Sequence, residues 1–435
     1  LTWPAWLAWL RRWEWALFAG GLAVYLLTHL VGLEQFPIYF HTDEALQSLR
    51  AAEFVNNGWR DASGEFFPTF FTNGPFYNLG VSVYLQVIPH LLFGFSETVT
   101  RGVPALLAGL AAAAIGLFLR HGSKAPHWWA GPLWLSTAPA WFLHARTGFE
   151  TVVMATFYAA LLYFYLLYRL RSPRWLYAAL VAGALAFYSY SPGQLVVLAT
   201  AVLLLVVDAR YHWQQRAVVA RGLALAAVLA APYVRFQINH PTASYFQLRE
   251  RGSFLVDPNV PLGEKVSRVA GEYVFGLNPA YWFWDSDRDI ERHRLGPYSH
   301  LLTATLPLAA LGLGLALRGW RAPPNRIILA ALLAAPLGGA VAEVGITRVL
   351  AFIVPATLLI GLGASAALAW LERFRLPPRS AALGLFVILA GFNLYLWREA
   401  LTAGGTWSRN YGLYGMQYGG RQLFGDAIPA YLDSH

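Results

Sequence analysis

Two adjacent acids follow the first long apolar run of the chain. His41, Asp43 and Glu44 open the stretch HTDEALQSLRAAEF, where a membrane protein is expected to avoid charge. A carboxylate at this place can act as a general base that takes a proton from an attacking hydroxyl or amine. Thr42 or Asp43 can equally cap the free N–H groups of a short helix over residues 44–58. The local pattern alone gives these two roles equal weight.

Further ionisable side chains stand near the ends of other apolar runs. Glu150 follows Arg146 by four residues, a spacing that allows an ion pair across one helical turn. Ionisable residues at a membrane boundary are nonetheless candidates for function. The acids of segment 285–291 alternate with arginines, which is typical of a solvated, self-paired surface, and together with His293 they match no metal-binding motif.

The composition identifies the class of protein. Of the 435 residues, 57% are hydrophobic and only 13% are charged, which indicates a polytopic membrane protein. The absence of cysteine excludes disulfides, thiolate metal sites and cysteine nucleophiles. The sequence contains no P-loop, no dinucleotide-binding glycine motif and no nucleophile elbow. A nucleotide-sugar donor is therefore disfavoured, and the basic loops need no nucleic-acid partner because membrane topology explains them.

Eleven apolar runs are long enough to cross a membrane as helices. A further run, 77–93, can either cross or lie at the interface, because Pro89 and His90 interrupt its end. The eleven predicted spans are 13–33, 98–119, 128–144, 150–168, 174–190, 193–209, 217–235, 298–318, 325–343, 347–370 and 380–398.

Charge parity decides between the two topologies. Short cytoplasmic loops collect Lys and Arg. If 77–93 does not cross, half of all Lys and Arg residues of the chain fall in the N-terminus and the short loops on the cytoplasmic side. We therefore predict a juxtamembrane helix at 77–93, a cytoplasmic N-terminus, an outer C-terminus, and long outer loops at 34–97 and 236–297. Residues 1–400 form the predicted transmembrane domain. The outer segment 401–435 is either the start of a soluble domain or a short tail.

Several motifs in order along the chain resemble those of the GT-C membrane glycosyltransferases. The likeness is to the protein O-mannosyltransferase and lipid A aminoarabinose transferase branch, which takes sugars from polyprenyl phosphates. It rests on the outer Asp-Glu pair and on TNGPFYNL, VTRGVPALLAGL, HARTGFE, AFYSYSPGQLVVL, FGLNPAYWFWDSDRDIERHRLGPYSHLL and GITRVLAFIVP. Two departures are that Thr72-Asn73-Gly74-Pro75 replaces the usual His-Pro-Pro, and that Glu150 stands where Asp is common. The sugar and the acceptor therefore stay open.

The resemblance implies a fold, a reaction and a set of site residues. We expect an all-α integral membrane protein with about eleven transmembrane helices, the GT-C fold, and juxtamembrane helices in the first outer loop. The implied reaction is an inverting sugar transfer at the outer face of a bacterial inner membrane. Its catalytic residues would be Asp43, as general base, with Glu44 and Glu150; its donor-phosphate ligands Arg146, Arg348 and Arg101; and its substrate pocket Tyr188, Tyr190 and His293.

Each of these roles has a structural alternative. Arginines at span ends commonly snorkel to the interface, and tyrosines there commonly form aromatic belts. Three outer arginines near the acids nevertheless favour phosphate binding without a metal. No cofactor is expected to be required; a divalent metal stays an unsupported alternative.

The expected partners are a lipid-linked sugar donor, an acceptor that is a protein, lipid or glycan, and membrane lipids. A different class of function stays open: a transporter or flippase of a lipid-linked substrate, or an inactive structural subunit of a membrane complex. Transporters place ionisable residues near the membrane midplane, whereas these acids gather at one face. This distribution favours catalysis.

Overall fold

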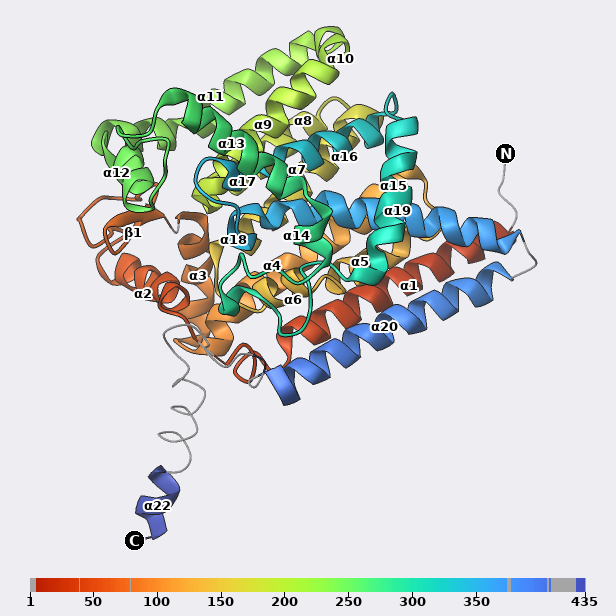
Figure 1. The fold of residues 1–435 in the computed structure, drawn as a ribbon, viewed down its shortest axis with the longest axis horizontal. Coiled ribbons are helices and arrows are strands. Elements are labelled where there is room, and N and C mark those ends of the chain that lie inside the picture. Colours follow the sequence, from red (N-terminus) through yellow and green to blue (C-terminus); the bar gives the residue numbers. More distant parts are fainter. Residues whose placement is uncertain are drawn as a thin grey trace.

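The computed structural model describes residues 5–38, 40–78, 80–373, 377–404, 407 and 428–434. Long helices form one bundle, and α2, α3, α12 and β1 gather at one end of it (Figure 1). The long helices are α1 (Ala5–Leu30), α4 (Glu97–Phe118), α7 (Glu150–Leu170), α8 (Trp175–Ser189), α9 (Ser191–Val207), α11 (Arg216–Asn239), α15 (Leu306–Arg318), α19 (Ile353–Glu372) and α20 (Pro378–Ala403).

Three predicted spans consist of shorter pieces. The first is divided where Pro139 begins a new helix, and the second where Pro336 ends one, since proline cannot supply a backbone N–H. The pieces are η2 (Trp128–Ala130), α5 (Gly131–Ser136) and α6 (Pro139–Ala145); α16 (Pro323–Ala334) and α17 (Leu337–Ala340); and α18 (Ile346–Val349) with η5 (Leu350–Phe352) before α19. A π-helical turn, η1 (Leu119–Ser123), extends α4, and the short α10 (Ala209–Gln214) precedes α11.

The segment predicted to be the first outer loop has its own small fold. Helix α2 (Thr42–Asn56) is followed by a hairpin of β1 (Phe71–Asn73) and β2 (Phe76–Asn78), in which Asn73 faces Phe76, and then by α3 (Gly80–Phe93). The predicted second outer loop holds α12 (Ala243–Glu250), α13 (Leu262–Leu277), α14 (Pro279–Phe283) and η3 (Glu291–His293), and η4 (Thr303–Thr305) follows it before α15.

Small residues allow the bundle to pack closely. The buried side of α4 carries Ala105, Ala108, Ala111 and Ala112, and α4 packs against α1, α5 and α7. A Cβ atom on Gly131 would lie 2.6 Å from the Cα atom of Gly116, so the backbones of α5 and α4 touch at this point. The alanine and glycine content of these spans therefore sets their spacing.

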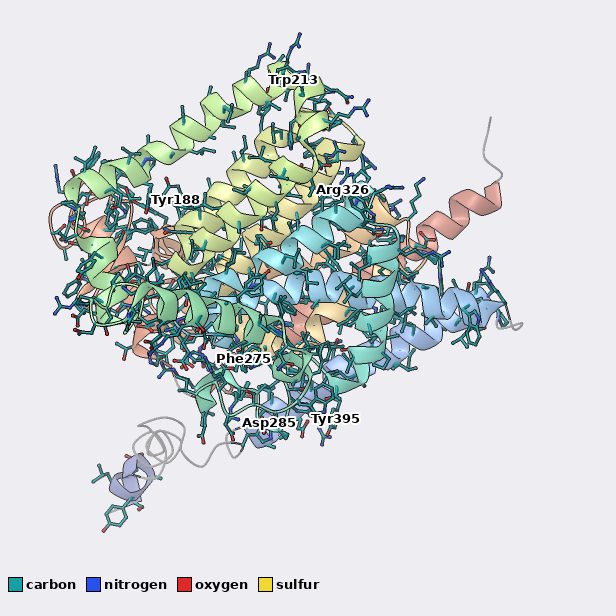
Figure 2. The ribbon with its side chains drawn as sticks, turned by 45° about the horizontal axis from the view of Figure 1, so that its top comes forward. Tyr188, Trp213, Phe275, Asp285, Arg326 and Tyr395 are labelled. Carbon is teal, nitrogen blue, oxygen red and sulfur yellow. The ribbon has the colours of Figure 1, made fainter. Side chains whose placement is uncertain are left out.

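Each predicted span contains helix, so the all-helical membrane fold is confirmed. Within the described residues, five helical segments are long and apolar enough to cross a membrane by length and composition. The exact number of eleven spans and their orientation stay predictions. Trp213 and Arg326 of predicted inner loops lie in the upper half of the view, and Asp285 of a predicted outer loop lies in its lower half (Figure 2).

Helix α3 supports the juxtamembrane interpretation of 77–93. Its 14 residues do not by themselves distinguish it from α8 and α15, which have 15 and 13 and lie in predicted spans. Its last turn exposes Leu91, Leu92 and Phe93, which suits contact with lipid. The predicted tail, 401–435, lies outside the described residues except for 401–404, Trp407 and α22 (Ile428–Ser434).

Candidate active site

Helix α2 is capped by His41 and Glu44. His41 Nδ1 accepts a hydrogen bond from the Asp43 amide at 3.0 Å, and Glu44 Oε1 accepts one from the His41 amide at 3.1 Å. Burial, together with the charge of Arg292, lowers the pKa of His41, which keeps Nδ1 free to accept. The capping role proposed for Thr42 or Asp43 is therefore wrong, because other side chains fill it.

Glu44 is a buried structural ion-pair partner. It is 1% exposed, and its carboxylate accepts hydrogen bonds from Arg101 Nε at 2.7 Å and Nη2 at 3.0 Å. The Gly148 amide donates a further bond at 2.7 Å. These contacts join α2, α4 and the turn before α7. The geometry does not support the expected catalytic role of Glu44, because its oxygens already carry strong donors.

Asp43 has a different environment from its neighbour. Its side chain is 39% exposed, and Asn73 Nδ2 donates to Oδ1 at 3.1 Å. Glu150, the first residue of α7, is 7% exposed and accepts hydrogen bonds from Gln47 at 3.2 Å and from Asn78 at 3.5 Å. Asp43 lies close enough for its charge to act on Glu150. Neutral amide groups thus orient both carboxylates without neutralising them.

Arg146 ties down the end of α1. It is fully buried, and all five of its N–H groups donate to backbone carbonyls at 2.6 to 3.2 Å. The expected pairing of Arg146 with Glu150 is absent from the ion pairs among the described residues. The accepting carbonyls belong to Thr28 in the last turn of α1 and to Val31, Gly32 and Phe36 in the segment that follows it. This geometry does not support phosphate binding by Arg146.

Arg101 is likewise committed to the protein interior. Besides Glu44, its guanidinium bonds to the carbonyls of Leu33 and Pro37, both at 2.7 Å, and to Glu97. It is fully buried. A phosphate could reach Arg101 only by displacing these groups, so the geometry does not support its expected role as a phosphate ligand.

Arg348 lines a cavity, whereas Arg101 and Arg146 are fully buried. Its Nη1 donates to the Glu343 carbonyl at 2.8 Å, and the cavity beside it has a volume of about 430 Å³. Arg251 lines the same cavity and lies 4.8 Å from the centre of the Phe76 ring in the hairpin. The cavity lining is basic, with Arg251, Arg268, Arg288 and Arg348 against Glu272 and Glu343. Arg288 pairs with both of these glutamates and Arg268 pairs with Glu264, whereas neither Arg251 nor Arg348 forms an ion pair among the described residues.

The three residues predicted to line a substrate pocket, Tyr188, Tyr190 and His293, have different surroundings in the structure. Tyr190, at the junction of α8 and α9, lies close enough to Glu150, Arg251 and Arg348 for their charges to act on it. Tyr188 instead donates to the Leu229 carbonyl at 2.6 Å and so ties α8 to α11. Tyr190 therefore lies near Glu150 and near two arginines of the cavity, whereas Tyr188 holds two helices together.

His293 packs against the turn before α7. Its ring lies 5.5 Å from that of His144 and 5.7 Å from that of Phe149, and burial lowers its pKa well below the usual range. Phe149 also contacts His41, the cap of α2. His293 therefore supports the acid-bearing helices from the second outer loop. Among the described residues, no group of three or more His, Asp or Glu side chains is placed to hold a metal ion.

Asp289 is a buried residue that binds several donors, although the alternating charges of its segment predicted a solvated surface. Its Oδ1 accepts from the Ile346 amide at 2.6 Å, and its Oδ2 from Tyr281 at 2.8 Å and His300 at 2.9 Å. Burial opposes ionisation, but these hydrogen bonds prevail and lower the pKa of Asp289. The contact holds the second outer loop against the start of α18, which carries Arg348.

Replacing Asp289 by Asn is expected to destabilise the protein by about 1–3 kcal/mol, because bonds to a buried charged acceptor are lost. A carboxylate with a lowered pKa stabilises the folded state above its unfolded pKa, and this contribution disappears as the pH falls through the folded pKa. The deficit of Asp289→Asn should therefore be full at pH 7 and should shrink in acid. Thermal unfolding across pH tests this, with Asp287→Asn, whose side chain is fully exposed, as the control. Equal unfolding temperatures for Asp289→Asn and wild type at pH 7 would contradict it.

Sequence reasoning missed Asn73 and Arg251 as well as Asp289. Asn73 was visible only as part of a turn, and its donor reaches a residue 30 positions away. Arg251 stands in an ordinary charged segment, so no local signal marked it. Glu272, which accepts from the Val344 amide at 2.6 Å, was also unmarked. Contacts between distant segments leave no periodic pattern.

Two comparisons place this architecture among known proteins. The sequence profile of the dolichyl-phosphate-mannose-protein mannosyltransferase family matches residues 81–236. No curated protein matches the chain in sequence. ArnT from Cupriavidus metallidurans, bound to undecaprenyl phosphate, has a similar structure, with a TM-score of 0.53 and 18% identity over 86% of this chain and 62% of ArnT.

Archaeal oligosaccharyltransferases have similar structures. AglB from Archaeoglobus fulgidus, in complex with an inhibitory peptide and a dolichol-phosphate, gives a TM-score of 0.60 at 13% identity over 95% of this chain and 60% of AglB. The A. fulgidus oligosaccharyltransferase tethered to an acceptor peptide gives 0.55 at 13% identity, over 93% and 59%. The chain therefore spans about 60% of the length of these three proteins.

These likenesses define the class of protein. The chain is a multi-pass membrane protein with the fold of the GT-C membrane glycosyltransferases. The resemblance to the branch that contains protein O-mannosyltransferases and ArnT, which the motifs indicated, is confirmed.

Proposed function

We propose that the chain is a glycosyltransferase that takes a sugar from a polyprenyl-phosphate donor and transfers it, with inversion, to an acceptor. The reaction takes place at the outer face of a bacterial inner membrane. The observation that carries this proposal is a chain of neighbours: Asp43 and Glu150, both held by neutral amides, lie close enough for the charge of Asp43 to act on Glu150, and Glu150 and the cavity arginines Arg251 and Arg348 lie close enough to act on Tyr190. The other acid of the Asp-Glu pair and the other two predicted arginines are committed to structure.

The proposed chemistry is a single displacement. Asp43 takes the proton of the acceptor hydroxyl or amine as its oxygen or nitrogen forms a bond to the anomeric carbon. The bond from this carbon to the phosphate oxygen breaks on the opposite side, and the leaving phosphate keeps the electron pair. Arg251 and Arg348 stabilise the negative charge that develops on it. Glu150 accepts hydrogen bonds from the sugar. The residues supply base and counter-charge, so no cofactor is proposed.

An apolar groove suits the lipid part of the donor. It has a volume of about 920 Å³ and is lined by α9, α13 and the α16–α17 region, with Val202, Val266, Val269 and Leu333 among its residues. Helix α13 separates it from the basic cavity, because Arg268 and Glu272 on another side of the helix line that cavity. We assign the groove to the prenyl chain and the cavity to the phosphate.

The similar structures support this assignment. ArnT was solved with undecaprenyl phosphate and AglB with a dolichol-phosphate. Both ligands join a long prenyl chain to a phosphate, which is the combination of groups that the groove and the cavity would accommodate. The sugar and the acceptor have no corresponding support, so the experiment must find them.

A donor panel tests the proposed function. The protein is reconstituted in vesicles with radiolabelled polyprenyl-phosphate hexoses and pentoses, and release or transfer of the label is measured. Turnover of one donor would support the proposal and name the sugar. Movement of intact donor across the bilayer without turnover would instead indicate a flippase. Neither turnover nor movement with any donor would favour a structural subunit.

Replacing Arg348 or Arg251 by Gln is expected to raise the KM for the donor about tenfold or more and to lower kcat, because each removes a charge-assisted bond to phosphate. Initial rates at varied donor concentration provide the measurement. Arg249→Gln is the matched control. Arg249 is exposed and lies two residues before Arg251, and its replacement removes the same charge. Equal KM values for the control and the two cavity variants would contradict phosphate binding in this cavity.

A further inference from the structure

The hairpin of the first outer loop is built to hold one side chain in place. Asn73 ends β1 and faces Phe76 across a two-residue loop in which Gly74 has φ = +58°. This left-handed conformation suits glycine at the first position of a tight hairpin turn. The Arg50 Nε donates to the Thr72 carbonyl at 2.9 Å and so ties the strand to α2. The turn therefore fixes where the Asn73 side chain begins.

An aromatic cluster makes the hairpin rigid with respect to α2. Phe71 of β1 is fully buried and packs edge-on against Phe54 of α2, with ring centres 5.7 Å apart. Tyr84 of α3 contacts both rings at 5.3 Å. Because α2 also carries Asp43, the hairpin and the acid belong to one packed unit. The hydrogen bond of 3.1 Å from Asn73 to Asp43 therefore joins two residues whose backbones are fixed relative to each other.

The two adjacent acids show why an amide at this point matters. Glu44 receives two bonds from a guanidinium and one from a backbone amide, and its charge is neutralised. Asp43 receives a side-chain bond from Asn73 at one oxygen, and its other oxygen lies 3.5 Å from His41 Nδ1, which is already an acceptor. An amide orients a carboxylate without the full positive charge of a guanidinium, which would favour the ionised form much more strongly.

We infer that Asn73 is the positioning residue of Asp43: its amide, presented by the β1–β2 hairpin, holds the carboxylate in the orientation in which it accepts the acceptor's proton. This inference rests on the proposed function, because it takes Asp43 as the base. Asn73 itself touches no reacting atom. The neighbouring Asn78 gives Glu150 the same kind of support, so the hairpin serves both carboxylates.

Asn73→Asp and Asn73→Ala test the inference by their effect on the pH dependence of turnover. The Asp variant places a second negative charge beside Asp43, which favours the protonated carboxyl. The acidic limb of kcat/KM is therefore expected to move up by about one pH unit. The Ala variant removes the donor, and kcat is expected to fall about tenfold with the donor KM little changed. Asn259→Asp, the same exchange at an exposed outer position, should leave rate and profile unchanged.

A donor-free titration separates this inference from the proposed function. Infrared difference spectra, wild type minus Asp43→Asn, report the protonation of Asp43 without any turnover. The corresponding difference spectra, Asn73→Asp minus the double variant Asn73→Asp/Asp43→Asn, should show that Asp43 becomes protonated with a midpoint at a higher pH. Thermal unfolding confirms that the variants are folded. A midpoint equal to that of wild type would overturn the inference whether or not a donor is found. Loss of turnover in Asp43→Asn with unchanged profiles in both Asn73 variants would also overturn it, while the proposed function would stand.

Discussion

Asp43→Asn is expected to lower sugar transfer at least a hundredfold, which is the scale for losing a general base. The amide keeps the size of the carboxyl group, and its oxygen still accepts the bond from Asn73. The helix cap is also untouched, because His41 and Glu44 provide it. The thermal unfolding temperature and the donor KM should therefore change little. Transfer of radiolabelled sugar by the reconstituted protein, with unfolding measured in parallel, provides the comparison.

The control for this variant is Asp287→Asn, which removes the same charge from a fully exposed side chain of the second outer loop. It should transfer sugar at the wild-type rate. If Asp43→Asn and the control both kept that rate, Asp43 would not be the base, and Glu150 would be the next residue to replace. A loss of transfer that comes with a lower unfolding temperature would point to a structural role for Asp43 and would contradict this prediction.

Arg101→Gln is expected to destabilise the folded protein by about 3–5 kcal/mol, because it leaves the Glu44 carboxylate buried without its partner. The side chain is fully buried, and the guanidinium also serves the carbonyls of Leu33 and Pro37. We expect a large fall in unfolding temperature and in the yield of monodisperse protein. Unfolding by heat in detergent, monitored together with gel-filtration profiles, measures both.

A double-mutant cycle identifies the source of this loss. Glu44→Gln should also destabilise, and combining it with Arg101→Gln should cost less than the sum of the two, since the second change removes a partner that is already unpaired. Arg249→Gln is the control for removing one positive charge from the outer face. If Arg101→Gln folded as stably as wild type but had a raised KM for the donor, Arg101 would be a phosphate ligand and its structural role would be contradicted.

The structure gives the residues of the motif-based site different surroundings, and the site itself stays a prediction. Asp43 lies close enough to Glu150 for its charge to act there, and Glu150 and Arg348 both lie close enough to act on Tyr190. Glu44, Arg101 and Arg146 are instead held by buried bonds, which no spacing along the chain could reveal. A motif shows that a residue type is needed at a position, but it does not distinguish a charge that binds substrate from one that binds the protein. The number and direction of hydrogen bonds make that distinction.

The departure of the Thr72-Asn73-Gly74-Pro75 stretch from the family motif illustrates the same limit. From sequence it indicated only a turn and left the sugar and acceptor open. In the structure the turn becomes a hairpin whose Asn73 reaches Asp43. Local residue types predicted the turn, because Gly-Pro favours one. The packing of Phe71 against Phe54 decided where the turn points.

The sequence by itself determined the membrane class, the helical nature of every predicted span and the position of an acid at the head of an outer helix. These follow from hydropathy and charge over short stretches, because a bilayer demands long apolar helices and tolerates few charges. Only the tertiary structure decided which of Asp43 and Glu44 keeps an accessible carboxylate and which arginine faces a cavity. Those properties depend on partners between 30 and more than 100 residues away, whose bonds form only when the helices pack.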